Sequence, residues 1–110
     1  MKVEETPLYQ GSVDFSKKLA SLGRKPAYVY SFLRDLPGDG QGAWHSAELW
    51  YTFGTLPRCW RPWEAGDYAL SCRMLDYWTN FIKTGDPNGE GLPAWRPCGE
   101  ADPFVMRLDV

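Results

Sequence analysis

Apolar residues early in the chain recur at helical spacing. Phe15, Leu19 and Leu22 lie at positions i, i+4 and i+7, which places them on one face of a helix. The pattern predicts a helix from Ser12 to Leu22, with Ser12 as a candidate cap at its start. Gly23 supplies a typical C-terminal stop.

A second, longer helical pattern runs from Asp67 to Thr84. Asp67 is a candidate N-cap, and Gly85 directly follows the last periodic position. Five apolar residues fall on one face at i, i+4, i+7, i+8 and i+11: Leu70, Met74, Tyr77, Trp78 and Phe81. This broad stripe predicts a helix that packs against a core.

Strand patterns occur at 27–33 and 104–108. The first is rich in aromatic and β-branched residues, and both of its alternating faces are apolar. Such a strand is typical of a parallel sheet covered by helices, which indicates the α/β class. Only the first pattern has two apolar faces, and one such strand cannot form a sheet, so we expect its neighbouring strands to lie outside this chain.

Length and charge narrow the function classes. At 110 residues, we expect a single segment, 1–110, of one domain's length. The 12 basic and 14 acidic residues give a net charge of −2, which argues against nucleic-acid binding. We expect no membrane span, because no apolar run reaches about 18 residues. Residues 1–7 lack the apolar stretch of a signal peptide, and the sequence leaves the localisation open.

Cofactor and metal motifs are not apparent. Cys59, Cys72 and Cys98 show no CxxC spacing, so a structural zinc site is not predicted. They leave open one disulfide with a free thiol, or three thiols. His45 and Glu48 would supply only two metal ligands, and no phosphate-binding loop is present. We therefore predict neither a metal nor a cofactor.

The single histidine, His45, is the main candidate for chemistry. It follows the loop after the predicted strand 27–33, and catalytic groups of open α/β sheets gather beyond the carboxyl ends of strands. Its imidazole can carry protons near neutral pH. A solvated loop histidine is the alternative. No serine lies in a Gly-x-Ser-x-Gly frame, so spacing alone gives a candidate base with no nucleophile to activate.

Two blocks resemble the type-B carboxylesterases, the family of cholinesterases and bacterial para-nitrobenzyl esterases. The first block, 42–54, resembles that family's active-site histidine segment, with His45, Glu48 and Tyr51 at matching positions. The second, 70–95, is similar to the helix and turn downstream of that histidine. The strand at 28–32 also resembles the strand that leads toward the histidine loop.

The resemblance implies an α/β-hydrolase fold, of which this chain would be the C-terminal portion. It also implies ester hydrolysis by a Ser–Glu/Asp–His triad with His45 as the catalytic histidine. The nucleophile, the oxyanion loop and the acid would then belong to a missing N-terminal part. We therefore expect the chain alone to be inactive, and Glu48 to support the histidine loop rather than to serve as the triad acid.

Three tryptophans outside the predicted helices have two interpretations. Trp44, Trp60 and Trp63 could form a carbohydrate-stacking surface, but a core or pocket-wall role is favoured. The resemblance implies that Trp60 and Trp63 lie near the mouth of a substrate gorge, and Trp44 is adjacent to His45, so we expect all three to line the pocket. Arg58 and Arg61 flank the rings and are candidates for cation–π pairs.

An alternative function belongs to a different class. The broad apolar stripe of helix 67–84 also suits a non-catalytic interaction or dimerisation module derived from an esterase, and it would favour a homo-oligomer. A companion Gly-x-Ser-x-Gly segment would separate the enzyme from this module.

Overall fold

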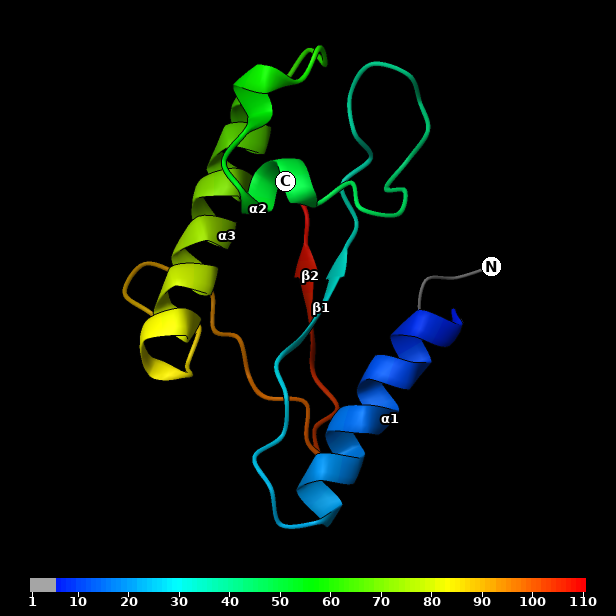
Figure 1. Cartoon of the computed structure of the whole chain (residues 1–110), viewed down its shortest axis with the longest axis vertical. Helices are drawn as coiled ribbons and strands as arrows, with labels where there is room; N and C mark the ends of the chain where they lie inside the picture. Colours follow the sequence, from blue (N-terminus) through cyan, green and yellow to red (C-terminus); the bar gives the residue numbers. More distant parts are fainter. Residues whose placement is uncertain (1–5) are drawn as a thin grey trace. The chain divides into compact units, whose positions relative to one another are not determined.

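A computed structural model describes residues 6–110. The elements are α1 (Pro7–Ser21), β1 (Val29–Phe32), α2 (Leu49–Thr52), the 3₁₀ helix η2 (Leu56–Arg58), α3 (Ala65–Thr84) and β2 (Val105–Leu108), shown in Figure 1. The chain divides into two compact units. The first unit comprises the chain up to Ser31 together with Trp95–Arg107, and the second comprises Phe32–Ala94 and Leu108–Val110.

Helix α1 begins five residues before the predicted start. The hydroxyl of Thr6 accepts a hydrogen bond from the amide of Tyr9 at 3.3 Å, and Pro7 occupies the first turn. Ser12 is therefore not a cap but an interior residue whose hydroxyl donates to the carbonyl of Leu8 at 2.8 Å. The predicted stop is confirmed, since Gly23 adopts the left-handed conformation with φ of 72°.

The buried face of α1 differs from the predicted one. Phe15 and Leu22 are 63% and 61% exposed, whereas Val13 and Ser16 are buried. Ser16 accepts a hydrogen bond from the amide of Ala27 at 2.7 Å and donates to the carbonyl of Cys98 at 2.6 Å. A buried serine thus anchors this helix, and a pattern of apolar positions alone cannot reveal such an anchor.

A small hydrophobic cluster surrounds this anchor in the first unit. Its buried members are Val13, Val29 and Cys98, and partly buried side chains pack against them: Tyr9, Ala27 and Val105. Trp95 also lies edge-on to Tyr28 and to Tyr30, with ring centroids 6.2 Å apart in both pairs. Aromatic and sulfur-containing side chains therefore supply much of this small core.

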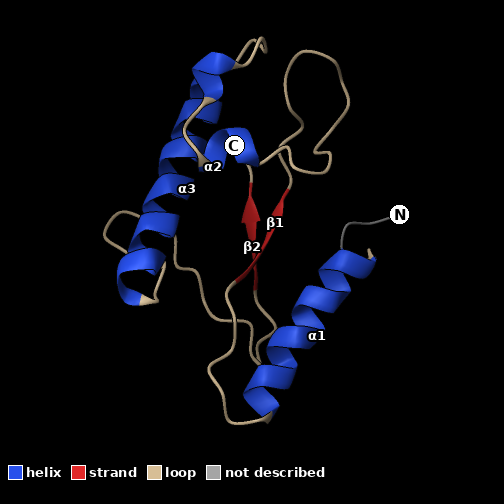
Figure 2. Cartoon of the chain, viewed as in Figure 1, coloured by secondary structure: helices blue, strands red, loops and turns tan. Residues whose placement is uncertain are grey.

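The strands β1 and β2 pair as a two-stranded sheet (Figure 2). The expectation that the sheet neighbours of the strand at 27–33 lie outside this chain is therefore wrong for one of them, because that neighbour is β2. The predicted C-terminal strand is confirmed as β2, in which Met106 and Leu108 are buried. Strand β1 is shorter than the predicted 27–33. The expectation that both of its faces are covered does not hold within the described residues, because Val29 is buried while Tyr30 is 38% exposed.

Helix α3 starts two residues before the predicted start. Glu64 is the N-cap, and the carboxylate of Asp67 accepts its amide at 2.9 Å in a capping box, so Asp67 is the third residue of the helix rather than its cap. The predicted stop is confirmed by Gly85, whose φ is 79° and whose amide donates to the carbonyl of Phe81 at 2.7 Å.

The core stripe of α3 is confirmed at three positions, Leu70, Met74 and Tyr77, which are each at most 1% exposed. Phe81 is 49% exposed, so the stripe ends one turn earlier than predicted. The short helix α2 packs against α3 and completes the core of the second unit.

The described residues also bear on the predictions about a membrane span, a signal peptide and the cysteines. Within residues 6–110 no helix is both long and apolar enough to cross a membrane. The predicted lack of a signal peptide concerns residues 1–7, of which 1–5 lie outside the described residues. All three cysteines are free thiols, and burial raises the pKa of the Cys98 thiol.

Candidate active-site histidine turn

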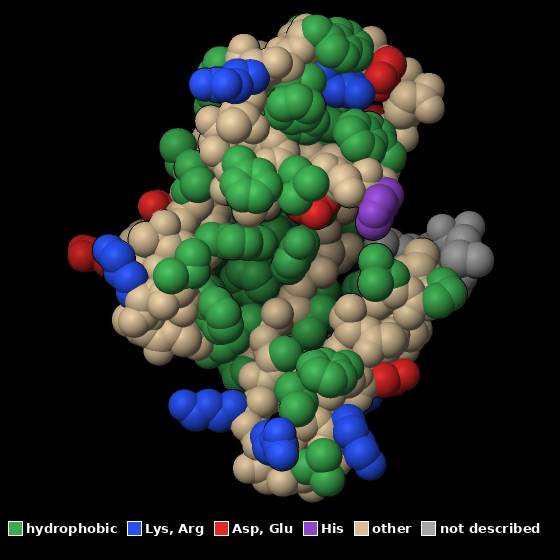
Figure 3. Space-filling view, in the orientation of Figure 1, with side chains coloured by type: hydrophobic (Ala, Val, Ile, Leu, Met, Phe, Trp, Pro, Cys, Tyr) green, Lys and Arg blue, Asp and Glu red, His purple; other side chains and the backbone are tan. Residues whose placement is uncertain are grey.

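His45 lies on a tight turn that leads into α2 (Leu49–Thr52). The amide of Ala47 donates to the carbonyl of Trp44 at 3.0 Å, and the amide of Leu49 donates to that of Ser46 at 3.2 Å. The side chain of His45 is exposed at the surface, where the histidine is the purple side chain of Figure 3. The turn therefore presents an accessible imidazole at the start of a helix.

Ser46 carries backbone strain directly after the histidine. Its φ of 70° lies in the left-handed region, which a residue with a side chain seldom adopts. Such a conformation costs on the order of 1 kcal/mol and persists only where the surroundings hold it. The residues on either side of the turn must therefore fix its shape.

Helix α2 is held by a fully buried tyrosine. The hydroxyl of Tyr51 donates to Oδ1 of Asp67 in α3 at 2.7 Å. The hydroxyl of Ser71 donates to the backbone carbonyl of Tyr51 at 2.8 Å. One α2 residue thus has both its side chain and its backbone tied to α3, six positions beyond His45.

Asp67 is the centre of this network. Nε of Arg34 donates to its Oδ1 at 2.7 Å and Nη2 donates to its Oδ2 at 3.0 Å, a bidentate ion pair around a carboxylate with no exposed surface. Arg34 follows β1 and also lies 3.5 Å from Glu64. Three segments far apart in sequence therefore meet at one carboxylate.

The network changes the pKa of each member. Burial opposes ionisation of Asp67, but the hydrogen bonds from Arg34, from the Glu64 amide and from Tyr51 outweigh it and lower the pKa of the carboxyl. The hydrogen bond with Asp67 raises the pKa of Arg34. Burial, followed by the hydrogen bond to Asp67, raises the pKa of Tyr51. The stable state is a carboxylate between a guanidinium and a protonated phenol.

Glu48 lies in the same turn as His45. Its backbone carbonyl accepts the amides of Tyr51 at 3.0 Å and Thr52 at 2.9 Å, so Glu48 begins the first turn of α2. Its half-buried side chain makes no capping hydrogen bond. The contribution of Glu48 to the local geometry therefore comes through its backbone.

The three tryptophans occupy two environments. Trp63 is half-buried, donates its indole N–H to the carbonyl of Leu56 at 2.6 Å, and lies edge-on to Tyr51 at 5.5 Å between centroids. Trp44 and Trp60 are 39% and 69% exposed, and the Arg61 guanidinium lies over both rings. The predicted lining residues therefore separate into one that supports α2 and two that lie at the surface.

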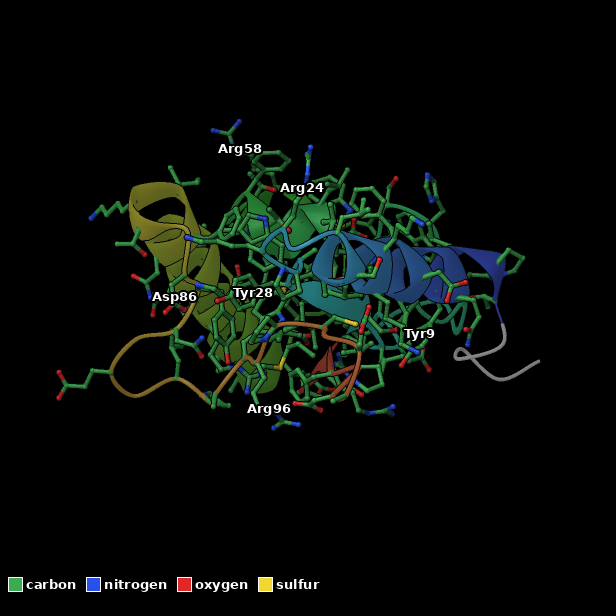
Figure 4. All side chains as sticks on the ribbon, turned by 90° about the horizontal axis from the view of Figure 1, so that it is seen from below. Tyr9, Arg24, Tyr28, Arg58, Asp86 and Arg96 are labelled. Carbon is green, nitrogen blue, oxygen red and sulfur yellow. The ribbon has the colours of Figure 1, made fainter. Side chains whose placement is uncertain are left out.

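The cation–π expectation holds for one arginine of the pair. The guanidinium carbon of Arg61 lies 4.8 Å from the Trp60 ring centroid and 5.8 Å from that of Trp44. Arg58 is exposed and points away from the ribbon (Figure 4). Among residues 6–110, no group of three or more His, Cys, Asp or Glu side chains is placed to hold a metal ion.

The model of the Carboxylesterase family matches residues 3–110. The chain belongs to this family. Carboxylesterase 4A of Bos taurus is 36% identical over 95 residues, a match that covers 77% of this chain and 16% of that protein. The chain therefore spans about a sixth of the length of this curated carboxylesterase.

Solved esterase structures share the fold. An esterase from Clostridium hathewayi, described as able to hydrolyse aliphatic aromatic polyesters, matches with a TM-score of 0.83 and 26% identity, covering 94% of this chain and 21% of that one. A PNB esterase matches with a TM-score of 0.76 and 25% identity over 92% of this chain and 21% of that one. The predicted α/β class is confirmed: the chain is a partial, C-terminal-like segment of an α/β-hydrolase fold.

The residues that organise this carboxylesterase segment are ones that periodicity did not single out. Arg34 lies two residues after the end of β1, and Tyr51 lies in a helix of only four residues. Asp67 was identified only as a cap. Nothing in the local sequence around Asp67 indicates that its carboxylate is fully buried. Its burial is explained only by its hydrogen bonds with Arg34 and Tyr51.

Proposed function

We propose that this chain is the histidine-bearing part of a carboxylic-ester hydrolase, with His45 as its general base. The observation that carries the proposal is an exposed imidazole on a strained turn whose following helix is tied to a buried ion pair. Family membership supplies the reaction class, and the turn supplies a base of fixed position.

In this mechanism His45 acts on a serine supplied from outside the chain. The imidazole takes the serine hydroxyl proton as the oxygen attacks the ester carbonyl, and then gives that proton to the departing alcohol as the acyl-enzyme forms. A water molecule, deprotonated by the same imidazole, then attacks the acyl-enzyme and releases the carboxylic acid product as the serine regains its proton. The triad acid that orients the imidazole also lies outside the chain.

The chain alone is inactive under this proposal, because the serine nucleophile lies outside it. Ser16 and Ser71 are buried, and each hydroxyl donates to a backbone carbonyl. Glu48 supports the histidine turn. Trp44, Trp60 and Trp63 line the approach of the ester once the rest of the hydrolase is in place.

The experiment joins the chain to a nucleophile. The segment of the PNB esterase that matches this chain is replaced by residues 1–110, and hydrolysis of p-nitrophenyl acetate is measured. We expect activity in the chimera, a loss of at least about a thousandfold in kcat for His45→Ala, and no loss for the exposed control Lys25→Ala. A chimera that is equally active with His45→Ala contradicts the proposal. The isolated chain should hydrolyse p-nitrophenyl acetate no faster than free imidazole does. Labelling of the isolated chain at a single site by a fluorophosphonate would also contradict the proposal.

A second candidate function is a non-catalytic module that dimerises through α3. Tyr68, Leu75 and Ile82 are 46%, 37% and 81% exposed and recur every seven residues, so they form an apolar stripe on one face of that helix. Light scattering would detect a dimer that Ile82→Glu dissociates and that Lys83→Glu, beside it, leaves intact. An inactive chimera together with such a dimer would favour this second function.

A further inference from the structure

The histidine turn has a second anchor, on the side away from α2. Residues 35–42 form a loop between β1 and the turn, and its ends are closed by two hydrogen bonds. The amide of Leu36 donates to the carbonyl of Gly42 at 3.4 Å, and the amide of Gly42 donates to Oδ1 of Asp35 at 3.1 Å. The loop is therefore a closed structure rather than an open strand of chain.

Arg61, which follows α2 in the sequence, binds this loop through its guanidinium. Its Nη1 donates to Oδ1 of Asp39 at 2.9 Å and to the carbonyl of Pro37 at 3.2 Å, and its Nη2 donates to Oδ2 of Asp39 at 3.0 Å. Only 7% of the arginine side chain is exposed. A guanidinium that binds a carboxylate bidentately and also a carbonyl fixes direction as well as distance.

The same guanidinium lies over two indole rings. Trp60 and Trp44 form the cation–π pairs with Arg61 described above, and Trp60 also lies close to the loop at Gly38. A Cβ added at Gly38 would lie 2.8 Å from Cη2 of Trp60, closer than side chains approach one another. The φ of +121° at Gly38 is also a conformation for which glycine is suited. The loop, the two rings and the arginine thus form one packed cluster.

We propose that Arg61 is a positioning residue for His45. With Asp39, Trp44 and Trp60 it forms a cluster, called here the arginine clamp, that fixes the residue immediately before the histidine. Tyr51 and Asp67 fix the helix immediately after it. This assignment rests on the proposed function, because positioning matters for a base that must meet a nucleophile within a fraction of an ångström.

The competing explanation is that the arginine clamp only stabilises an exposed loop. In that case its removal would loosen residues 35–42 and leave the histidine where it is. The two explanations differ in one observable, the environment of the His45 imidazole. The chain contains a single histidine, so its imidazole C–H signals in NMR spectra belong to this residue alone.

The test is NMR spectroscopy of the full 110-residue chain and its variants. In Arg61→Ala we expect the His45 imidazole signals to shift or broaden, and the amides of Leu36 and Gly42 to exchange about tenfold to a hundredfold faster. Asp39→Asn should give the same direction of change, and Arg61→Lys a smaller one, because lysine keeps the charge without the planar fork.

Arg96 supplies a matched control. It pairs with Asp102 at 2.7 Å and lies 4.1 Å above the Phe104 ring, so it combines the same two interactions in the first unit (labelled in Figure 4). Arg96→Ala should leave the His45 signals unchanged. The methyl signal of Met74, which is fully buried, reports whether each variant keeps the core of the second unit.

Two results would overturn the proposal: His45 signals unchanged in a folded Arg61→Ala chain, or wild-type His45 signals that coincide with those in urea. If the Met74 signal shows that Arg61→Ala has lost the core of the second unit, the variant Trp60→Leu is used instead. Trp60 is 69% exposed, and the same changes in the His45 signals are expected. None of these measurements requires catalysis. An inactive chimera would therefore contradict the proposed function without deciding whether the arginine clamp orders the turn.

Discussion

The hydroxyl of Tyr51 in α2 donates to the buried carboxylate of Asp67 in α3 at 2.7 Å. Through this bond the helix that follows the histidine turn shares a carboxylate with Arg34, at the end of β1. A four-residue helix has little stability of its own, so its position depends on such tertiary contacts.

Replacing Tyr51 with phenylalanine isolates that hydrogen bond. The ring contacts with Phe32, at 5.0 Å, and with Trp63 are retained, while the carboxylate loses a donor. We expect the free energy of unfolding to fall by about 1.5–3 kcal/mol, the range for hydrogen bonds to charged groups. Urea unfolding measures the change. Tyr68→Phe, at an exposed position of α3, is the control, and an equal loss in both variants would contradict the role of the bond.

Asp67 should make stability depend on pH in the acid range. Its folded pKa is lowered, so it lies below the unfolded value of about 3.9. The stabilisation is therefore complete above that value and disappears as the pH falls through the folded pKa. Urea unfolding between pH 2 and 6 should show a slope in the wild type that Asp67→Asn reduces. The variant should also lose about 3–5 kcal/mol near neutral pH, because the guanidinium of Arg34 loses its buried carboxylate and keeps only the exposed Glu64. Identical slopes in the two proteins would refute this assignment.

Ser16 should be the most sensitive serine of the first unit. Ser16→Ala leaves the amide of Ala27 and the carbonyl of Cys98 without this partner in a buried site, at a cost of about 1–3 kcal/mol. Ser21→Ala removes only a local bond from an exposed serine to the carbonyl of Lys18 and should cost less than about 0.5 kcal/mol. Thermal unfolding followed by circular dichroism compares the two, and a Ser21 effect as large as that of Ser16 would count against the buried anchor.

Two glycines of the loop at 35–42 separate steric clash from backbone strain. Gly38 and Gly40 both have positive φ, but an added Cβ meets the Trp60 ring only at Gly38 and finds nothing within 4 Å at Gly40. Gly40→Ala should cost about 1 kcal/mol for backbone strain alone. Gly38→Ala should cost about 1–3 kcal/mol more, because its φ of +121° lies farther from the left-handed helical region and its Cβ meets the Trp60 ring. Chemical denaturation measures both, and equal costs would show that Trp60 does not press on the loop.

Sequence patterns predicted the elements whose burial follows an apolar period. Helix α3 and strand β2 were found because Leu70, Met74 and Tyr77 in one, and Met106 and Leu108 in the other, combine regular spacing with clear stops. Helix α1 begins earlier than the pattern predicts, because the hydroxyl of Ser12 bonds to the carbonyl four residues earlier inside the helix instead of capping its start. The Thr6–Pro7 pair was the available signal for the true start.

The polar organisation could not be predicted in the same way. Tyr51 and Asp67 are 16 residues apart, and Arg34 and Asp67 are 33 apart, so no local window contains the network. Ser16 likewise meets a carbonyl 82 residues away. Periodicity reports which side chains avoid water, whereas buried polar groups are identified only by the partners that the fold brings to them.

The left-handed backbone at Ser46 has a consequence for any shortened or redesigned version of this segment. A backbone conformation that its own residue disfavours relaxes when the tertiary contacts on either side of it are removed. Transplanting residues 44–49 alone would transfer the sequence of the turn without its backbone conformation.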